Sequence, residues 1–443
     1  MHFLWLGHFD RSLEPEIRRA VDRSGFAGRF HFAGHDPDTD VYYAGSDLYL
    51  LTSREDPFPA VVLESLQVGV PVIGFEGAGG FTHLLRRGCG RLAPAFDTAA
   101  AAREVLDLLG NPDRVVSLGE RGRELVRDEY CFRHYLFDLL DMGQMRMDRV
   151  SVIVPNYNYA RYLGDRIRSI VHQTLPFFEL IVLDDASSDD SIDVLDALQV
   201  ELDVEIRVVR NSENSGSPFH QWGRGVAMAR GDFVWIAEAD DVAEPGFLAE
   251  VTAAFADPDV VMSYCQSKQI GSAGEILAGH YLDYTAEVSR ERWIQAYTAR
   301  GIEEIRTCLA IKNTIPNVSA VVFRREALLR AIESRLGNML EYRIAGDWIA
   351  YLELLKSGSI AYTPRALNRH RRHQSSVTIA SDNLPHLLEV LRVQKMVREQ
   401  YELDPIVRGK ARDYAQKLYE YFELRSDAAP DVAMLDEAAS LLE

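Results

Sequence analysis

Two apolar runs near the middle of the chain end abruptly in carboxylates, and this pattern limits the fold more than any other feature. Residues 233–241 read Phe-Val-Trp-Ile-Ala-Glu-Ala-Asp-Asp, and the apolar run 180–183 is followed directly by Asp184 and Asp185. Strands buried on both faces of a parallel sheet read as continuous apolar runs, and open α/β sheets bind ligands beyond the carboxyl ends of their strands. The two acidic strand ends therefore predict one site for a polyanion and a metal ion.

Length and composition allow two or three domains with ordinary cores. The chain has 443 residues, of which 47% are hydrophobic and 10% aromatic, and this suits globular domains of the usual size. No stretch reaches the roughly 18 uncharged apolar residues of a membrane span. Residues 1–7 lack the basic start and the long apolar run of a signal peptide. A cytoplasmic location is the expectation that follows.

Charge and cysteine content exclude further classes of protein. A formal net charge of −19 at pH 7 argues against a nucleic-acid partner with a broad contact surface and against strong adhesion to anionic lipid. A local basic patch, such as residues 369–372, is still compatible with it. The four cysteines are far apart and form no CxxC pair, which predicts reduced residues rather than a zinc site or a redox couple.

Changes of pattern divide the chain into three parts. Residues 1–142 alternate short apolar runs with helical patterns, as expected for βα units. After a short linker at 143–148, residues 149–378 repeat this alternation and predict a second α/β domain. Its expected strands are 150–154, 180–183, 204–209, 233–237 and 260–264. Residues 379–443 show helical periodicity, with one apolar stripe that predicts packing against a partner element.

The acidic strand ends have simpler explanations when each is taken alone. Glu238 and Asp240 are two residues apart, so in extended backbone they face the same side and could share Mn²⁺ or Mg²⁺. An isolated acidic triplet is otherwise typical of a solvated turn. Residues 187–189 could likewise cap the helix expected to start near Ser191. Capping would explain the serines, but not the two further carboxylates at the end of the strand.

Six motifs within residues 149–378 occur in the order found in glycosyltransferase family 2, and this part of the chain resembles that family. They are Val-Ser-Val-Ile-Val-Pro-Asn-Tyr-Asn (150–158), Gln-Thr (173–174), Leu-Asp-Asp-Ala-Ser-Ser-Asp (183–189), Asn-Ser-Gly (214–216), Trp-Ile-Ala-Glu-Ala-Asp-Asp (235–241) and Gly-Asp-Trp (346–348). The resemblance implies a GT-A fold, a nucleotide-diphosphosugar donor and an inverting mechanism. It also implies a glycan or lipid-linked acceptor, with at most peripheral contact at the inner membrane face.

The resemblance gives individual residues a role in binding the donor. The nucleotide pocket would be lined by Pro155, Tyr157 and Asn158, and the base and ribose would meet Asp184 and Asp185. Glu238 and Asp240 stand where the family's DxD motif holds the metal and the diphosphate. Because Glu at the first position departs from the commonest form, Asp240 is the firmer candidate for metal contact.

The resemblance also names Asp347 as the general base. A single in-line displacement needs one carboxylate to take the proton of the acceptor hydroxyl while a cation stabilises the leaving diphosphate. Taken alone, Asp347 before Trp348 would be typical of a helix N-cap. Residues 317–319 match a glycosylation sequon, which is interpreted as accidental in a chain without a signal peptide.

The basic segment 367–378 is similar to one that closes the donor site in this branch of the family. Its arginines Arg371 and Arg372 could pair with phosphate oxygens, and His373 could approach the diphosphate or the metal. Read without the resemblance, the segment is a solvated basic loop. We expect it to close over the donor.

Residues 1–142 carry a different resemblance, to the carboxyl-terminal half of a family 4 glycosyltransferase of the GT-B fold. The motifs are Ser-Arg-Glu-Asp-Pro-Phe-Pro-Ala-Val-Val-Leu-Glu (53–64), Gly-Val-Pro-Val-Ile-Gly (69–74) and Gly-Ala-Gly-Gly (77–80). Asp56 and Glu64 would occupy the paired-acid motif, with Glu64 facing the donor ribose. The second Rossmann-like domain of a GT-B enzyme and its Arg and Lys pair are missing. We therefore expect a vestigial donor site without catalysis, either because the chain is a fragment of a longer bifunctional enzyme or because this half-domain became structural.

Two classes of function follow. The leading hypothesis is a metal-dependent inverting glycosyltransferase of surface polysaccharide synthesis, built from two Rossmann-like α/β domains, with the helical tail as an accessory or docking element. The alternative is a non-catalytic scaffold that binds nucleotide-sugar or glycan in a polysaccharide synthase complex. Retention of every expected carboxylate in residues 149–378 favours catalysis. A nucleotide-binding oxidoreductase is excluded, because no GxGxxG fingerprint follows a strand.

Overall fold

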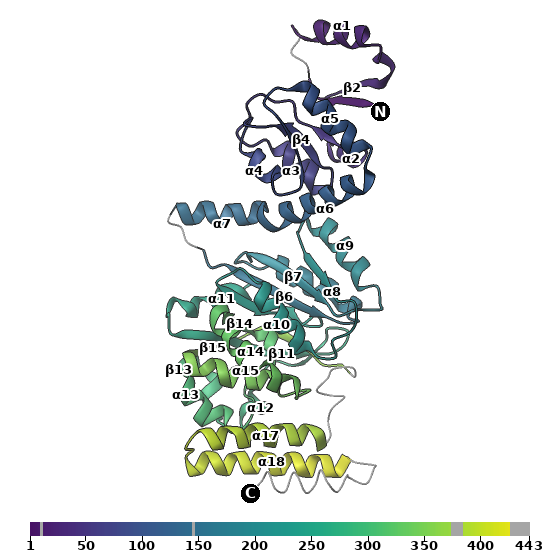
Figure 1. Ribbon diagram of the computed structural model, residues 1–443. Coiled ribbons are helices and arrows are strands. Elements are labelled where there is room, and N and C mark those ends of the chain that lie inside the picture. Colours follow the sequence, from purple (N-terminus) through teal and green to yellow (C-terminus); the bar gives the residue numbers. More distant parts are fainter. Residues whose placement is uncertain (9–11, 144–146, 374–383, 426–443) are drawn as a thin grey trace. The chain divides into compact units, whose positions relative to one another are not determined.

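The structure is a computed structural model that describes residues 1–8, 12–143, 147–373 and 384–425 (Figure 1). Within these ranges no helix combines the length and the apolar character that crossing a membrane requires. The chain divides into two compact units, Met1–Gly143 and Gln144–Glu443.

The first unit contains two small parallel sheets and the helices that connect their strands (Figure 1). The strands are β1 (Phe3–Leu6) paired with β2 (Phe30–Gly34), and β3 (Tyr49–Leu50), β4 (Val72–Phe75) and β5 (Gly90–Ala93) in that order. The helices are α1 (Glu14–Ser24), α2 (Asp40–Ala44), α3 (Ala60–Gln67), α4 (Phe81–Leu85), α5 (Thr98–Leu109), α6 (Pro112–Glu129) and α7 (Phe132–Met142). The predicted alternation of strands and helices is confirmed.

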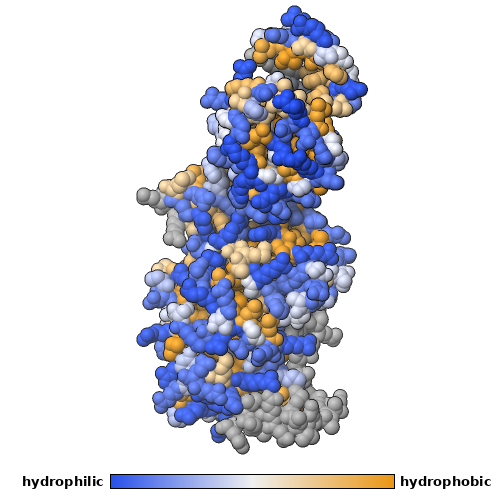
Figure 2. Space-filling view, viewed as in Figure 1, coloured by the Kyte–Doolittle hydropathy of each residue, from blue (hydrophilic) through white to orange (hydrophobic). Residues whose placement is uncertain are grey.

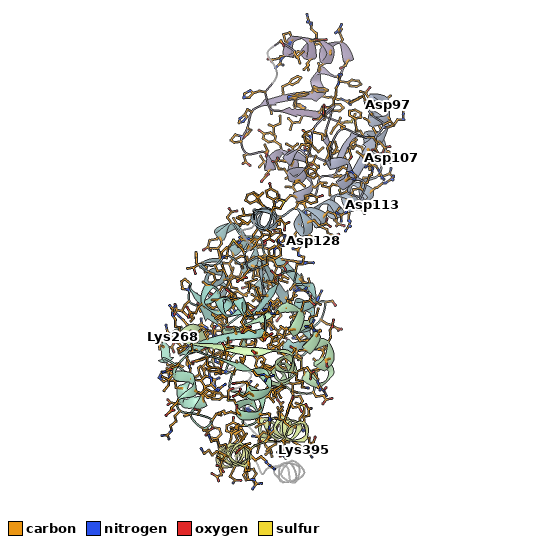
Figure 3. All side chains as sticks on the ribbon, turned by 90° about the vertical axis from the view of Figure 1, so that its left-hand side faces the viewer. Asp97, Asp107, Asp113, Asp128, Lys268 and Lys395 are labelled. Carbon is orange, nitrogen blue, oxygen red and sulfur yellow. The ribbon has the colours of Figure 1, made fainter. Side chains whose placement is uncertain are left out.

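The core of the first unit lies around β4, which is buried at every position. Two close approaches require glycine there. A Cβ on Gly74 would lie 2.7 Å from the Phe81 ring, and one on Gly119 of α6 would collide with the carbonyl oxygen of Gly69. The surface of this unit carries both apolar and charged residues. Figure 2 shows exposed apolar residues on it, and Figure 3 shows Asp97 and Asp107 on one side of it.

The second unit contains a ten-stranded sheet with the strand order β10-β15-β11-β14-β9-β6-β7-β8. In addition, β12 pairs with β11, and β13 pairs with β15. The strands are β6 (Val150–Asn156), β7 (Glu179–Asp184), β8 (Arg207–Arg210), β9 (Phe233–Ile236), β10 (Val242–Ala243), β11 (Val260–Ile270), β12 (Ile276–Ala278), β13 (Tyr297–Arg300), β14 (Val321–Arg324) and β15 (Ser359–Arg371). Strands β8, β7, β6 and β9 are parallel, whereas β14 is antiparallel to β9 and β11. The carboxyl ends of β6, β7 and β9 therefore meet at one edge.

Helices cover both faces of this sheet, which explains why the strands read as continuous apolar runs. Val152 and Val154 of β6 pack into one core cluster with residues of α8, α9 and α11, and Ile153 packs into the opposite cluster with residues of α10, α14 and α15. These helices are α8 (Ala160–Val171), α9 (Ser191–Leu202), α10 (Pro218–Met228), α11 (Phe247–Thr252), α14 (Arg325–Leu340) and α15 (Gly346–Leu354). Short helices α12 (Leu282–Thr285) and α13 (Gly301–Glu304) lie between β12 and β14 in the sequence.

The described part of the tail, 384–425, forms two helices that lie side by side, α17 (Leu384–Gln400) and α18 (Pro405–Arg425) (Figure 1). Val393 of α17 is completely buried in the main core cluster of the second unit. Gln394 Nε2 donates hydrogen bonds to the carbonyl oxygens of Ile311 (2.7 Å) and Ala411 (3.1 Å). Lys395, labelled in Figure 3, is on the same helix. The predicted helical tail is confirmed, and α17 is part of the core.

Three predicted elements have different limits in the structure. Strand β8 begins at Arg207 rather than at residue 204, and β11 continues to Ile270. Residues 367–371 of the basic segment belong to β15 instead of a loop, because they pair with β11 on one side and β10 on the other. Residues 374–378 of that segment and the last part of the tail, 426–443, lie outside the described residues. The domain limits given above stay predictions.

Candidate active site

The loops that follow β6 and β7 are tied together by Asn and Ser side chains. Asn156 Nδ2 donates hydrogen bonds to Asp184 Oδ2 (2.8 Å) and to Ser187 Oγ (3.1 Å). Asn158 Oδ1 accepts from the backbone N–H of Ser188 at 2.8 Å. Asn158 has a φ of 58°, a left-handed conformation that Asn adopts more readily than most residues. Asn158, predicted to line the nucleotide pocket, thus fixes the shape of both loops.

The serines of the second loop take part in this network, and of the three residues that could cap α9, 187–189, Asp189 is the one that contacts its start. Ser187 Oγ accepts the backbone N–H of Asn158 at 3.0 Å. At the start of α9, Asp189 Oδ1 accepts a hydrogen bond from the backbone N–H of Ser191 at 3.1 Å. Asp189 Oδ2 also accepts the backbone N–H of Ala160 at 2.9 Å, which links the beginnings of α8 and α9.

Asp184 and Asp185 are buried, and their oxygens already have partners in the protein: Asp184 in the second loop, and Asp185 after β8 and on α10. Asp184 Oδ1 accepts the backbone N–H of Ser187 at 3.0 Å. Asp185 Oδ1 accepts from Asn211 Nδ2 (2.6 Å) and Gln221 Nε2 (2.8 Å). Both carboxylates therefore stabilise the structure around the strand ends through these hydrogen bonds. Their contact with base and ribose stays a prediction.

The two remaining residues of the predicted nucleotide pocket differ in exposure. Pro155 is buried within β6 beside Leu183 of β7. Tyr157, two residues further on, is 46% exposed. An exposed aromatic ring at the end of a strand is suited to stack on a base. Of these two residues, Tyr157 is the one that can contact a ligand directly.

Glu238 and Asp240 follow β9 and have different partners. Glu238 Oε1 accepts a hydrogen bond of 3.3 Å from Trp222 Nε1, and Asp240 Oδ2 lies 2.9 Å from His373 Nε2. Burial, together with the negative charges of Asp240 and Asp241, raises the pKa of Glu238 to about 8. The strand end thus concentrates negative charge that a cation would stabilise.

The donor set at this strand end fits a divalent metal. Carboxylate oxygens are ligands of Mg²⁺ and Mn²⁺, and histidine is a common ligand of transition metals, of which Mn²⁺ is one. Asp240 and His373 bring both kinds of donor atom together, with Glu238 on the same strand end. Within the ranges that the structure describes, no cluster of three or more His, Cys, Asp or Glu side chains is arranged as a metal site. The metal therefore stays a proposal.

Asp241, the third carboxylate, holds the surrounding backbone. Its Oδ1 accepts the backbone N–H of Arg371 at 2.8 Å, and its Oδ2 accepts from Asn317 Nδ2 at 2.7 Å. Ser319 Oγ accepts the backbone N–H of Glu238 at 3.0 Å. Asn317 and Ser319 are both buried, so the apparent glycosylation sequon supports the acidic triplet instead.

Arg371 faces the protein interior rather than a donor. Its side chain is 2% exposed, Nε donates to the carbonyl oxygen of Asp240 at 2.7 Å, and Nη1 donates to the carbonyl oxygens of Gly271 (3.3 Å) and Ser272 (3.2 Å). Because protein acceptors occupy the guanidinium, we reassign Arg371 from diphosphate contact to positioning of Asp240. Arg372 is partly exposed, and its contact with the donor stays a prediction.

Sequence reasoning did not single out Arg166, which lies beneath the acidic triplet. Its side chain is completely buried, and its guanidinium carbon lies 4.7 Å from the centre of the Trp235 ring. Its three nitrogens have no hydrogen-bond partner among the described residues. Burial lowers the pKa of Arg166 to about 10, and the charges of Asp241, Asp240 and Glu238 oppose this shift. Arg166 is one of the groups whose charge offsets the triplet, and it lies on the buried face of α8.

Asp347 is the second residue of α15, and its carboxylate is held on both sides. Asn313 Nδ2 donates to Oδ2 at 3.1 Å, and the backbone N–H of Trp348 donates to Oδ1 at 2.6 Å. Ala345 occupies the N-cap, so the alternative that Asp347 is the N-cap is wrong. Burial raises the pKa of Asp347 from 3.8 to about 7, a value suited to a general base near neutral pH.

Helix α10 and Tyr351 join Asp347 to the acidic triplet. On α10, Trp222 contacts Glu238 and Phe219 packs so closely on Gly346 that a Cβ there would collide with its ring. Burial, and then the charges of Asp347 and Glu238, raise the pKa of Tyr351. The fold therefore brings together the predicted base and the predicted metal-binding strand end.

Asp56 and Glu64, the predicted vestigial donor site, lie in the first unit. Tyr43 Oη donates to Glu64 Oε2 at 3.4 Å. Burial, followed by the charges of Glu64 and Asp56, raises the pKa of Tyr49, so both carboxylates act on the same tyrosine. Both acids of the motif therefore lie near enough to affect the partly buried Tyr49.

Comparison with known proteins identifies the two parts of the chain. Residues 151–328 match the sequence model of glycosyl transferase family 2, and residues 13–125 match that of glycosyl transferases group 1. An uncharacterized glycosyltransferase of Nostoc sp. is 38% identical over 26% of this chain and 34% of its own length. A Bacillus subtilis glycosyltransferase named for teichuronic acid biosynthesis is 27% identical over 48% of this chain and 74% of its own length.

The chain spans about a third of the length of the first two curated relatives, 34% and 32%. A crystal structure of Staphylococcus aureus TarS in complex with UDP-GlcNAc covers 66% of this chain and 79% of that chain, at 17% identity and a TM-score of 0.48. Both predicted resemblances and their order are confirmed by the sequence models. Residues 151–328 are therefore similar to glycosyl transferase family 2, and residues 13–125 are similar to the glycosyl transferases of group 1.

Proposed function

We propose that this protein is an inverting, metal-dependent glycosyltransferase. It transfers a sugar from a nucleotide-diphosphosugar to a hydroxyl of a growing or lipid-linked glycan in surface polysaccharide synthesis. The observation that carries the proposal is that helix α10 contacts both parts of the site: Trp222 donates to Glu238, and Phe219 packs on Gly346, the residue before Asp347. The family match of residues 151–328 supports the same reaction class.

The proposed chemistry is a single displacement. Ionised Asp347 accepts the proton of the acceptor hydroxyl as its oxygen forms a bond to the anomeric carbon of the sugar, and the bond from that carbon to the diphosphate breaks. Asn313 and the backbone of Trp348 hold the carboxylate in place for this step. A bound Mn²⁺ or Mg²⁺, held by Asp240 and His373 with Glu238 nearby, would stabilise the negative charge of the leaving diphosphate.

The donor and acceptor sides of the proposal rest on different observations. Exposed Tyr157, the loops shaped by Asn158, and partly exposed Arg372 provide a surface for a nucleotide and its phosphates. The relatives named for teichuronic acid and for poly(ribitol-phosphate) suggest a cell-surface polymer as acceptor. We place the reaction on the cytoplasmic side, with at most peripheral contact at the inner membrane face.

Thermal unfolding of the full chain tests this proposal. UDP, GDP, CDP and dTDP are each added with and without Mn²⁺. A nucleotide at about a hundred times its dissociation constant stabilises the folded state by roughly 2.7 kcal/mol, enough to raise the melting temperature by several degrees. We expect one nucleotide to act only with Mn²⁺ and Asp240→Asn to remove the effect. If none acts, the transferase proposal fails and the scaffold alternative takes its place.

A further inference from the structure

The turn that leads into α15 is held by a carboxylate from the tail helix α17. Glu389 Oε1 accepts the backbone N–H of Arg343 at 2.8 Å, and Oε2 accepts those of Ile344 and Ala345, both at 2.9 Å. Glu389 is 8% exposed. Successive backbone N–H groups that converge in this way form an anion-binding concavity, and here a side chain of the same chain fills it.

This turn sets the position of Asp347. The N-cap of α15 is Ala345, and Glu389 accepts the N–H of this residue and of the two residues before it, so it holds the backbone that enters the helix. Asp347 follows two residues later. A displacement of about 1 Å in a reacting group can lower a rate about 100-fold, so the acceptor that fixes this turn matters for catalysis.

Helix α17 also contacts the second element that holds Asp347. Gln394 Nε2 donates to the carbonyl oxygen of Ile311, two residues before Asn313, whose side chain binds Asp347 Oδ2. Leu387 and Leu391 of the same helix are completely buried. One buried helix therefore braces both the turn 343–345 and the loop that carries Asn313.

We propose that Glu389 is the positioning residue for the general base Asp347, which makes α17 part of the active site rather than an accessory or docking element. The inference rests on the proposed function, because it takes Asp347 as the base. Glu389 itself touches neither donor nor acceptor. It acts through the backbone of residues 343–345, so its loss lowers turnover while donor binding is retained.

Two measurements on the full chain test this role. Hydrogen exchange of the backbone N–H groups of residues 343–345 should speed up in Glu389→Ala. Release of nucleoside diphosphate is then followed with UDP-N-acetylglucosamine, UDP-glucose and GDP-mannose in the presence of Mn²⁺. We expect kcat to fall by about 10- to 100-fold while the KM for the donor stays within about twofold. Glu389→Gln keeps one acceptor oxygen. Its hydrogen exchange at residues 343–345 and its kcat should therefore lie between those of the native chain and Glu389→Ala.

Glu399→Ala is the matched control, because Glu399 is an exposed residue of the same helix. It should leave both exchange and kcat unchanged. Unchanged exchange at 343–345 in Glu389→Ala, or equal losses in the two alanine variants, would overturn the proposal. If the native chain turns over no donor, the proposed function fails, and exchange alone decides whether Glu389 holds the turn.

Discussion

His373 Nε2 lies 2.9 Å from Asp240 Oδ2, although the two residues are 133 positions apart. Asp240 follows the short strand β9, and His373 follows the long strand β15. Between them, Arg371 hydrogen-bonds the backbone of Asp240 and the carboxylate of Asp241. The pairing of β15 with β10 therefore carries the histidine to the acidic strand end.

The first prediction concerns this pair. His373→Ala should weaken binding of Mn²⁺ in the presence of nucleotide by at least about 10-fold, because it removes one of the two groups proposed to hold the metal. Titration of Mn²⁺ followed by calorimetry measures it. His172→Ala, which changes an exposed histidine at the end of α8, is the control. Equal affinities in the native chain and His373→Ala would remove His373 from the site.

The second prediction concerns the general base. Asp347→Asn should lower kcat by about 10²- to 10⁴-fold and leave nucleotide binding intact, because the amide keeps the shape of the side chain but cannot take a proton. In the native chain kcat should rise with pH through about 7, the pKa of buried Asp347. Turnover that survives in Asp347→Asn would contradict its role.

The third prediction follows from the same pKa and concerns stability. Folded Asp347 holds its proton more tightly than unfolded Asp347 does, so its contribution to stability is complete below pH 3.8 and is lost as the pH rises through about 7. Asp347→Asn should therefore melt at a higher temperature than the native chain at pH 8, and the difference should shrink toward pH 4. Melting curves across this range check it, and a difference independent of pH would argue against a buried, ionisable Asp347.

The fourth prediction concerns Arg166. Arg166→Met removes a buried positive charge that lowers the pKa of Glu238, so Glu238 should hold its proton to higher pH and Mn²⁺ should bind more weakly at pH 7. The melting temperature should fall as well, because removing one member of a group of buried opposite charges leaves the carboxylates uncompensated. Arg161→Met, at an exposed position of the same helix, should change neither. A drop in stability with unchanged Mn²⁺ affinity would refute the electrostatic role.

The fifth prediction concerns the first unit. Glu64→Gln should leave sugar transfer unchanged, because every group assigned to the proposed reaction lies in the second unit. The comparison is with Asp347→Asn in the same assay. Transfer that is lost in Glu64→Gln but kept in Asp347→Asn would assign the reaction to the first unit.

Much of the candidate site follows from local pattern. The apolar runs ending at Asp184 and at Glu238 predicted parallel strands whose ends share one edge, and the structure confirms that arrangement. This prediction succeeds because a strand that is buried on both faces of the sheet reads as a continuous run of apolar residues, which is visible within a few positions of the sequence. The role of Arg371 could not be predicted, because a basic residue in sequence gives no sign of which carbonyl oxygens will surround it.

The sequence by itself determined the α/β class, the order of the two family segments and the carboxylates at the strand ends, since these depend on residues close together in the chain. Only the tertiary structure decided that Glu389 holds the turn before Asp347 and that Arg166 lies beneath the acidic triplet. Both depend on packing between elements far apart in sequence. Helical periodicity shows that a face is buried, but not which partner it meets.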